Sequence, residues 1–148
     1  MGIDRANTLG QIDATMFADS ATSTAAATHA RRAEVRQFAA ATAAESHRLR
    51  EETAKIAKSA GLTPTISPND ITAGDIALTL SLINGGAKST DVDGLYMSGM
   101  VSRDFAMTSL AHMKTFVPAN SDIKPLLQKV VSAGQARAAA IAALEKKK

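Results

Sequence analysis

The sequence of 148 residues lacks cysteine and tryptophan and contains only one tyrosine and four phenylalanines. Without cysteine the chain can form no disulfide bond, no thiolate metal site and no cysteine nucleophile. No run of about 18 consecutive apolar residues occurs, so the sequence predicts no transmembrane helix. The residue types that favour β-strands are scarce and scattered, whereas alanine occupies 30 positions. Because alanine has the highest helix propensity and lets helices approach closely, the composition predicts an all-α protein.

A strong excess of charge of one sign is also lacking. The net charge is +3, and three of the positive charges belong to the terminal run Lys146–Lys148. The rest of the chain is close to neutral and has no basic stripe interleaved with aromatic residues, which argues against binding of nucleic acid. The first residues contain no apolar stretch of the kind found in secretory signal peptides. We therefore expect either a cytosolic protein or an exported one whose signal is not part of this sequence.

Capping and helix-breaking residues divide the chain into four long helices and one short helix, which is typical of a four-helix bundle with one irregular crossover. We expect a single domain over residues 1–148, with the core between about 9 and 144 and a basic tail at 145–148. The expected helix ends are marked, in chain order, by Asn7 and Ala30, Gly61, the Ser67–Asp70 cap and Gly85–Gly86, Asp91, and Asn120–Ser121.

A pattern late in the chain is similar to one helix of a known family. That pattern is Phe-Asp-x-x-Tyr followed six or seven residues later by Asp-His. The chain matches it at Val92, Asp93, Tyr96, Met100 and Val101, with Arg103-Asp104 in place of Asp-His. Upstream, the stretch from Glu34–Ala39 through Ile56-Ala57 to Gly61 resembles the second helix of the same family, and downstream Asp122–Lys124 resembles the start of its last helix. Over about residues 9 to 144 the chain thus resembles a bacterial exported ferritin-like family, domain of unknown function 4142, whose members are often labelled outer membrane proteins.

The resemblance implies a ferritin-like four-helix bundle, a periplasmic or envelope location and a set of positions for metal ligands. The usual ligand residues are absent from those positions. The acidic residue of the first helix falls at Ser20, with Asp19 beside it, and the histidine of the second helix falls at Ser46, between Glu45 and His47. A divergent member that has lost its metal ligands is therefore expected.

The orientation of the second helix separates its three polar candidates. An α-helix turns by about 100° per residue, and the apolar stripe that runs from Val35 to Ile56 has Glu45 near its centre. Ser46 then lies at the edge of the stripe and His47 on the opposite, solvated side. We expect Glu45 to point into the bundle.

The two remaining histidine positions of the family are occupied by Asp104 and Arg137. An opposite-charge pair can fill a polar hole in a bundle if both members are hydrogen-bonded. We therefore hypothesise that a salt bridge between Asp104 and Arg137, with Glu45 close by, stands in for the metal cluster. The alternative is that both residues are ordinary surface charges. The weak candidates for ligands of iron or another divalent metal are Asp19, Glu45, His47 and Asp104.

No catalytic motif is present in the sequence. There is no Glu-x-x-His pair of the di-iron bundles, no phosphate-binding loop and no suggestive set of serine, histidine and acid. Four methionines lie at helical spacing in the fourth helix and are expected to be core residues rather than a copper site; they are Met97, Met100, Met107 and Met113. The sequence thus predicts no catalytic residue and leans against an enzyme.

Three functions from different classes remain open. The leading one is a non-enzymatic, exported or envelope-associated bundle with a degenerate metal site and no cofactor, which acts as a structural or binding module. The second is a metal-binding oxidoreductase or storage protein of the di-iron type. The third is a self-assembling protein, because Gly99, Gly134 and the Ala138–Ala143 face would let helices of two subunits pack closely. The expected partner is an unidentified protein or a second copy of the chain.

Overall fold

The residues that the structure describes form five helices, which confirms the predicted all-α class. The structure, a computed structural model, describes residues 2–65, 72–85, 88, 90–113 and 122–147, and no strand occurs among them. The helices are α1 (Gly2–His29), α2 (Ala33–Ala60), α3 (Thr72–Asn84), α4 (Val92–Met113) and α5 (Ile123–Lys146).

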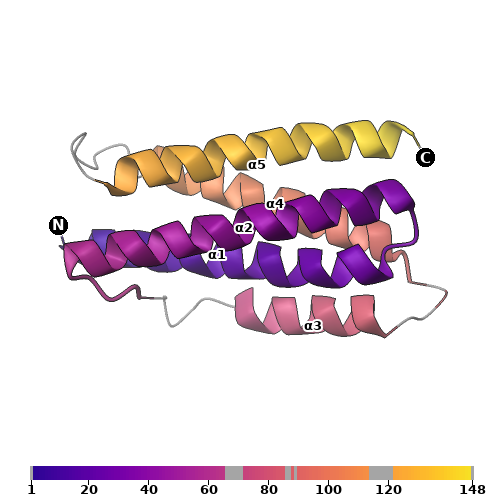
Figure 1. Ribbon diagram of the computed structural model, residues 1–148, viewed down its shortest axis with the longest axis horizontal. Coiled ribbons are helices and arrows are strands. Elements are labelled where there is room, and N and C mark those ends of the chain that lie inside the picture. The colour runs from indigo at the N-terminus through magenta and orange to yellow at the C-terminus, as the bar shows by residue number, and fades with distance from the viewer. Residues whose placement is uncertain (1, 66–71, 86–87, 89, 114–121, 148) are drawn as a thin grey trace.

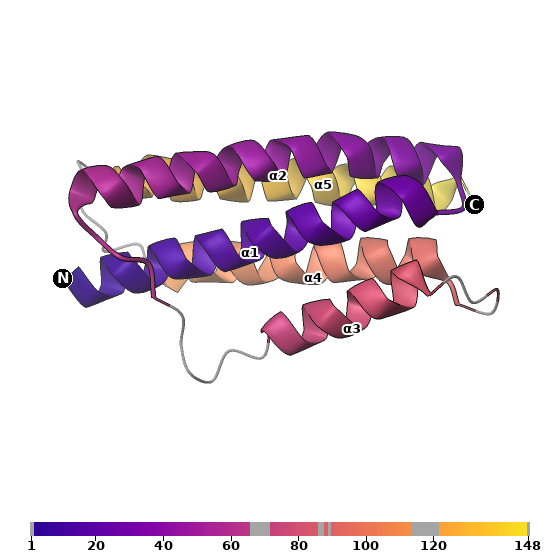
Figure 2. The same cartoon turned by 60° about the horizontal axis from the view of Figure 1, so that its bottom comes forward.

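Four long helices lie side by side, and the short helix α3 packs outside them against α1 and α4 (Figures 1 and 2). Each long helix runs antiparallel to its neighbours; on α2 and α5, for example, Glu45 pairs with Arg137 and Glu52 with Lys129. Helices α2 and α4 run in the same direction, so the connection between them returns along the length of the molecule and includes α3 (Figure 2).

One series of buried residues on α1 and one on α2 recur at three or four positions, the spacing that keeps one face of a helix against its neighbours. The series on α1 is Leu9, Ile12, Met16, Asp19, Ser23 and Ala26, continued by Ala30 just after the helix, and the series on α2 is Val35, Ala39, Thr42, Ser46, Leu49, Thr53 and Ala57. Thr8, Ala18 and Thr22 are also buried on α1, beside its series. The middle of both series is polar. Apolar residues accordingly form two separate core clusters, one around Ile12, Met107 and Leu126 and the other around Ala26, Met97 and Ile141.

Several predicted helix ends are confirmed, and one is wrong. Gly61 ends α2 in the left-handed conformation, with φ of 67°, and the Asp91 carboxylate accepts the N–H of Gly94 at the start of α4 at 3.0 Å. Helix α1 begins at Gly2 rather than near Asn7. The Asn7 side chain accepts a hydrogen bond from Gln11 one turn later at 2.7 Å, so it bridges along the helix surface.

Other expected ends lie outside the described residues, namely the Ser67–Asp70 cap, Gly86 and Asn120–Ser121. Helix α5 begins at Ile123, after Asp122. Among the helices that the structure describes, none is both long enough and apolar enough to cross a membrane.

Candidate functional site

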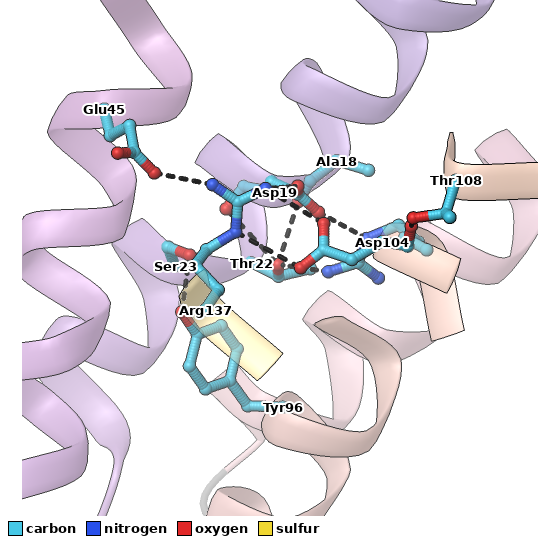
Figure 3. Close-up of polar contacts among 10 residues, drawn as sticks. Ala18, Asp19, Thr22, Ser23, Glu45, Tyr96, Asp104, Thr108 and Arg137 are labelled. Atoms are coloured by element: carbon cyan, nitrogen blue, oxygen red, sulfur yellow. Dashed lines mark hydrogen bonds and ion pairs between the residues drawn. The ribbon is translucent and has the colours of Figure 1, made fainter. Parts of the chain in front are cut away.

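A cluster of buried charges lies at mid-height between the two apolar cores. Asp19 comes from α1, Asp104 from α4 and Arg137 from α5, while Glu45 reaches the cluster from α2 (Figure 3). Arg103, which precedes Asp104 on α4, completes it. Asp19, Asp104 and Arg137 are almost entirely removed from solvent. Charged groups that are buried so completely are tolerated only where they neutralise and hydrogen-bond one another.

Arg137 is the centre of the cluster. Its Nη2 and Nε donate to the two carboxylate oxygens of Asp104 at 2.9 and 3.2 Å, the bidentate geometry in which a guanidinium binds a carboxylate most strongly. Its Nη1 donates to Oε1 of Glu45 at 2.6 Å. Nη2 also lies 3.6 Å from Oδ2 of Asp19, an ion-pair distance. One guanidinium thus contacts carboxylates from three other helices.

The second guanidinium binds α4 to α1. Arg103 Nε donates to Oδ1 of Asp19 at 2.7 Å, and its Nη2 donates to the Thr22 hydroxyl at 3.0 Å. That hydroxyl in turn donates to the carbonyl of Ala18 at 2.8 Å. The carboxylate of Asp19 is therefore held between two arginines on two different helices.

A pair of hydroxyl groups, from Ser23 and Tyr96, extends the cluster of buried charges toward the apolar core around Ala26, Met97 and Ile141. We call the charge cluster and this pair the polar layer. Ser23 Oγ and Tyr96 Oη lie 2.6 Å apart inside the bundle, and the Tyr96 ring packs edge-on against Phe38 with 6.3 Å between ring centroids. Burial raises the pKa of Tyr96 to about 12, although the Ser23 hydrogen bond opposes the shift. Tyr96 is therefore a neutral hydrogen-bonding group at physiological pH.

Burial also shifts the pKa of both buried carboxyls in the cluster. It raises the pKa of Asp19 to about 6, against the opposing attraction of Arg103 and with a contribution from the like charge of Asp104. It raises the pKa of Asp104 as well, while the hydrogen bonds and charge of Arg137 act the other way. The pKa of Arg137 is raised, because its carboxylate partners outweigh the burial that would lower it. Three carboxylates face two guanidiniums, and the raised pKa of Asp19 means that burial favours the protonated form of this carboxyl.

Two buried oxygens in the described part of the chain have no hydrogen-bond partner: Oδ2 of Asp19 and Oγ of Ser46. The close approach of α4 and α5 at this level depends on Gly134, because a Cβ at that position would lie 3.2 Å from Cβ of Asp104. The cluster reaches the surface through a cleft of about 200 Å³ between α2 and α5, lined by Phe38, Ala41, Thr42, Glu45, Ala133, Ala136, Arg137 and Ala140.

The ion pair between Asp104 and Arg137 that the sequence predicted is present, with Glu45 beside it. The expected orientation of α2 is wrong by one residue. Ser46 is fully buried, whereas the Glu45 side chain is 39% exposed and lies on the flank of the helix that faces α5. The reason is that the buried stripe alternates by three and four through Thr42, Ser46 and Leu49.

The first helix shows a similar offset. Asp19, rather than Ser20, points into the bundle, since it follows Met16 by three residues and precedes Ser23 by four in the buried series. That spacing was visible in the sequence and could have identified Asp19 as a buried residue. The sequence predicted no role for Arg103. It lies three residues after Met100, a spacing that fits a surface residue as well as a buried one.

The remaining sequence candidate, His47, lies outside the cluster; it is exposed and pairs with Glu51 at 2.8 Å. The other two histidines of the chain, His29 and His112, are exposed at helix ends. Met97, Met100 and Met107 are core residues, while the Met113 side chain lies outside the described part. Gly134, which could have served close packing either between subunits or inside one bundle, packs against Asp104 inside the chain.

A metal ion at the cluster would be bound by Asp19, Glu45 and Asp104, since their carboxylate oxygens are the metal-binding atoms of the cluster. Each of these side chains is bound by an arginine. Within the described residues, no group of three or more histidine or acidic side chains is arranged to hold a metal ion.

Comparison with family models, with curated proteins and with solved structures found no match to this chain.

Proposed function

We propose that this protein is a non-enzymatic, ferritin-like helical module in which an ion-pair cluster has replaced a metal centre, and that it acts as a structural or binding protein of the cell envelope. The sequence motifs around Val92–Asp104 motivate the family assignment and the exported location. The arrangement of the helices supports the ferritin-like topology, because α2 and α4 are parallel and joined by a long crossover while all neighbouring long helices are antiparallel.

The observation that carries the proposal is the position of Arg137. Ferritin-like bundles build their metal sites from side chains that project inward from four helices, and here four helices contribute charged residues to one level. At this height of the bundle, Arg137 contacts Asp19, Glu45 and Asp104. A guanidinium is permanently charged and engages the carboxylate oxygens a metal would use, and its charge repels a cation.

The replacement of histidines by an acid and a base keeps the bundle intact without metal. A hydrogen-bonded pair of opposite charges fills the polar space that a metal site would occupy. Removal of only one partner would leave a buried charge uncompensated. A structural role therefore accounts for the ion pairs of the cluster without any bound group.

Metal retention tests the proposal. The protein is incubated with Fe(II), Mn(II) or Zn(II), desalted and analysed for metal content. The wild-type chain is expected to retain much less than one equivalent. The matched variant Asp104→His with Arg137→His, which restores the two histidine positions implied by the family, is expected to retain more. Near-stoichiometric metal in the wild-type chain that is lost in Asp104→Ala would favour the di-iron alternative instead.

A further inference from the structure

We propose that the cleft between α2 and α5 binds a small molecule with an apolar body and one carboxylate, and that this carboxylate takes the place of Glu45 on the Arg137 guanidinium. The proposal deepens the function above by naming a ligand class for the same cluster. It rests on that function in one respect, because ion pairs rather than a metal ion must occupy the cluster.

The lining of the cleft is typical of a site for a small molecule. Its polar groups come from Thr42, Glu45 and Arg137. The rest of the lining is apolar and mostly short, and consists of Phe38 and Ala41 on α2 and of Ala133, Ala136 and Ala140 on α5. Small-molecule sites are lined mainly by apolar groups, with a few polar groups that fix the orientation of the ligand.

The size of the cleft limits the ligand. Its volume is about 200 Å³, and an engineered cavity of about 150 Å³ in another protein holds benzene. A ligand body of one ring or a short branched chain therefore fits the cleft. Benzoate combines a body of this size with one carboxylate, so it is a suitable probe.

Arg137 offers one nitrogen to such a ligand. Its Nε and Nη2 donate to the two carboxylate oxygens of Asp104 inside the bundle. The remaining nitrogen, Nη1, donates to Oε1 of Glu45 at 2.6 Å, and both side chains line the cleft. Figure 3 shows the Glu45 side chain reaching the guanidinium from α2. A ligand carboxylate at Nη1 therefore leaves the pair of Arg137 and Asp104 in place.

Glu45 is the carboxylate of the cluster that can leave. Its side chain is 39% exposed, whereas the side chains of Asp19 and Asp104 are 0% and 5% exposed. The Glu45 carboxylate can turn into water, and the ligand carboxylate then replaces it without a change in the charge around Arg137. A dianion such as phosphate would add negative charge beside Asp19 and Asp104, which disfavours it.

The wall of the bundle beside the cleft also has an unused hydrogen-bonding group. Ser46 follows Glu45 in the chain and lies one turn from Thr42 in the buried series of α2. Its Oγ is buried without a hydrogen-bond partner, although buried polar groups usually have one. This hydroxyl is a second sign that the polar layer can accept a further polar group at this wall.

Titration of the protein with sodium benzoate, followed by NMR or calorimetry, tests the proposal. We expect a dissociation constant of about 0.1–10 mM for a ligand of this size. Benzamide has nearly the same shape but no charge, and it should bind at least about tenfold more weakly. Inorganic phosphate should also bind at least about tenfold more weakly than benzoate.

The variant Glu45→Gln tests the position of the ligand. It weakens the side chain that competes for Nη1, so benzoate should bind about five- to tenfold more tightly. Glu52→Gln is the matched control, because Glu52 is also 39% exposed and also joins α2 to α5, through Lys129 at 2.9 Å. Both substitutions remove one negative charge, so a general electrostatic effect would appear in both variants.

The variant Ala136→Leu tests the cleft itself. The larger side chain occupies part of the space, so benzoate should bind at least about tenfold more weakly. Ala139→Leu is the control, because Ala139 is an exposed alanine of the same helix that does not line the cleft. Circular dichroism of all variants should show wild-type helicity, since the four substituted side chains lie partly or wholly at the surface.

Three outcomes would overturn the proposal: no binding of benzoate up to about 50 mM, equal binding of benzamide, or equal effects within either pair of variants. Metal retention is the separate measurement of the proposed function. A chain that retains no metal and binds no benzoate would overturn the ligand class and leave the proposed function standing. A chain that retains metal would overturn both.

Discussion

Arg137 binds Asp104 through two hydrogen bonds, of 2.9 and 3.2 Å, across the interior of the protein, where both side chains are more than nine-tenths buried. The two residues lie on α5 and α4, and the same guanidinium reaches Glu45 on α2. This pair therefore ties the packing of three helices to the neutrality of their shared interior. Its strength and its dependence on pH can be measured in variants.

The Arg137→Met variant should be destabilised by about 3–5 kcal/mol, because it leaves the Asp104 carboxylate buried without its bidentate partner. The free energy of unfolding from urea titrations measures the loss. Lys129→Met is the matched control: it removes a surface pair with Glu52, with N–O distance 2.9 Å, and should cost less than about 1 kcal/mol. Combining Arg137→Met with Asp104→Leu should recover much of the loss. Equal effects of the buried and surface substitutions would contradict this account.

The stability of the protein should fall as pH rises from about 4 to about 6. The pKa of Asp19 is about 6 in the folded chain, whereas the ordinary value for aspartate is 3.8, so in this window the folded state holds more protons than the unfolded state. The unfolding free energy therefore decreases with pH, by about 3 kcal/mol for this group. The raised pKa of Asp104 acts in the same direction.

The Asp19→Asn variant should flatten this pH dependence, which urea unfolding at several pH values would show. Ser20→Asn, the adjacent change on the same helix, leaves every carboxylate in place and should keep the wild-type slope. A variant Asp19→Asn with an unchanged slope would show that another group titrates.

Tyr96→Phe should destabilise the protein by about 1–2 kcal/mol, since it leaves the buried Ser23 hydroxyl without its partner. Ser23→Ala should cost a similar amount. In the double variant the two costs should not add, and the coupling energy should be about 1 kcal/mol. Thr24→Ala provides the control, because that hydroxyl is exposed and donates to the carbonyl of Ser20 in its own helix, at 2.7 Å. Additive effects of the two buried substitutions would argue against the hydrogen bond.

Gly10→Ala should destabilise the protein by about 1–3 kcal/mol through overpacking. A Cβ on Gly10 would overlap the backbone of Thr65, where the Thr65 N–H donates to the carbonyl of Ala6 at 3.1 Å. Gly99→Ala makes a fair comparison, because its Cβ would meet only the flexible end of Arg103 at 3.2 Å. Since alanine favours the helix, Gly99→Ala should be neutral or stabilising in thermal unfolding. The reverse order of the two melting temperatures would contradict the packing described here.

The polar layer shows where inference from the sequence succeeded and where it stopped. The Asp104–Arg137 pair was predicted because a family pattern placed both residues at facing positions. The family pattern placed the acidic position of the first helix at Ser20, although Asp19 beside it is the buried residue. Ser46 was placed at the edge of the apolar stripe, and it is fully buried. A one-residue error rotates a side chain by about 100°, which is enough to exchange a buried site for the surface.

The sequence by itself determined the helices. Alanine content, apolar periodicity and local signals such as Gly61 and Asp91 act within a few residues of the chain, so the all-α class and several helix ends follow from it. Only the tertiary structure decided which polar groups meet. The contacts of Arg103 with Asp19 and of Tyr96 with Ser23 join residues more than 70 positions apart, and they depend on the rotation and height of each helix against the others. Those are fixed by packing of all the helices together, which no local sequence signal encodes.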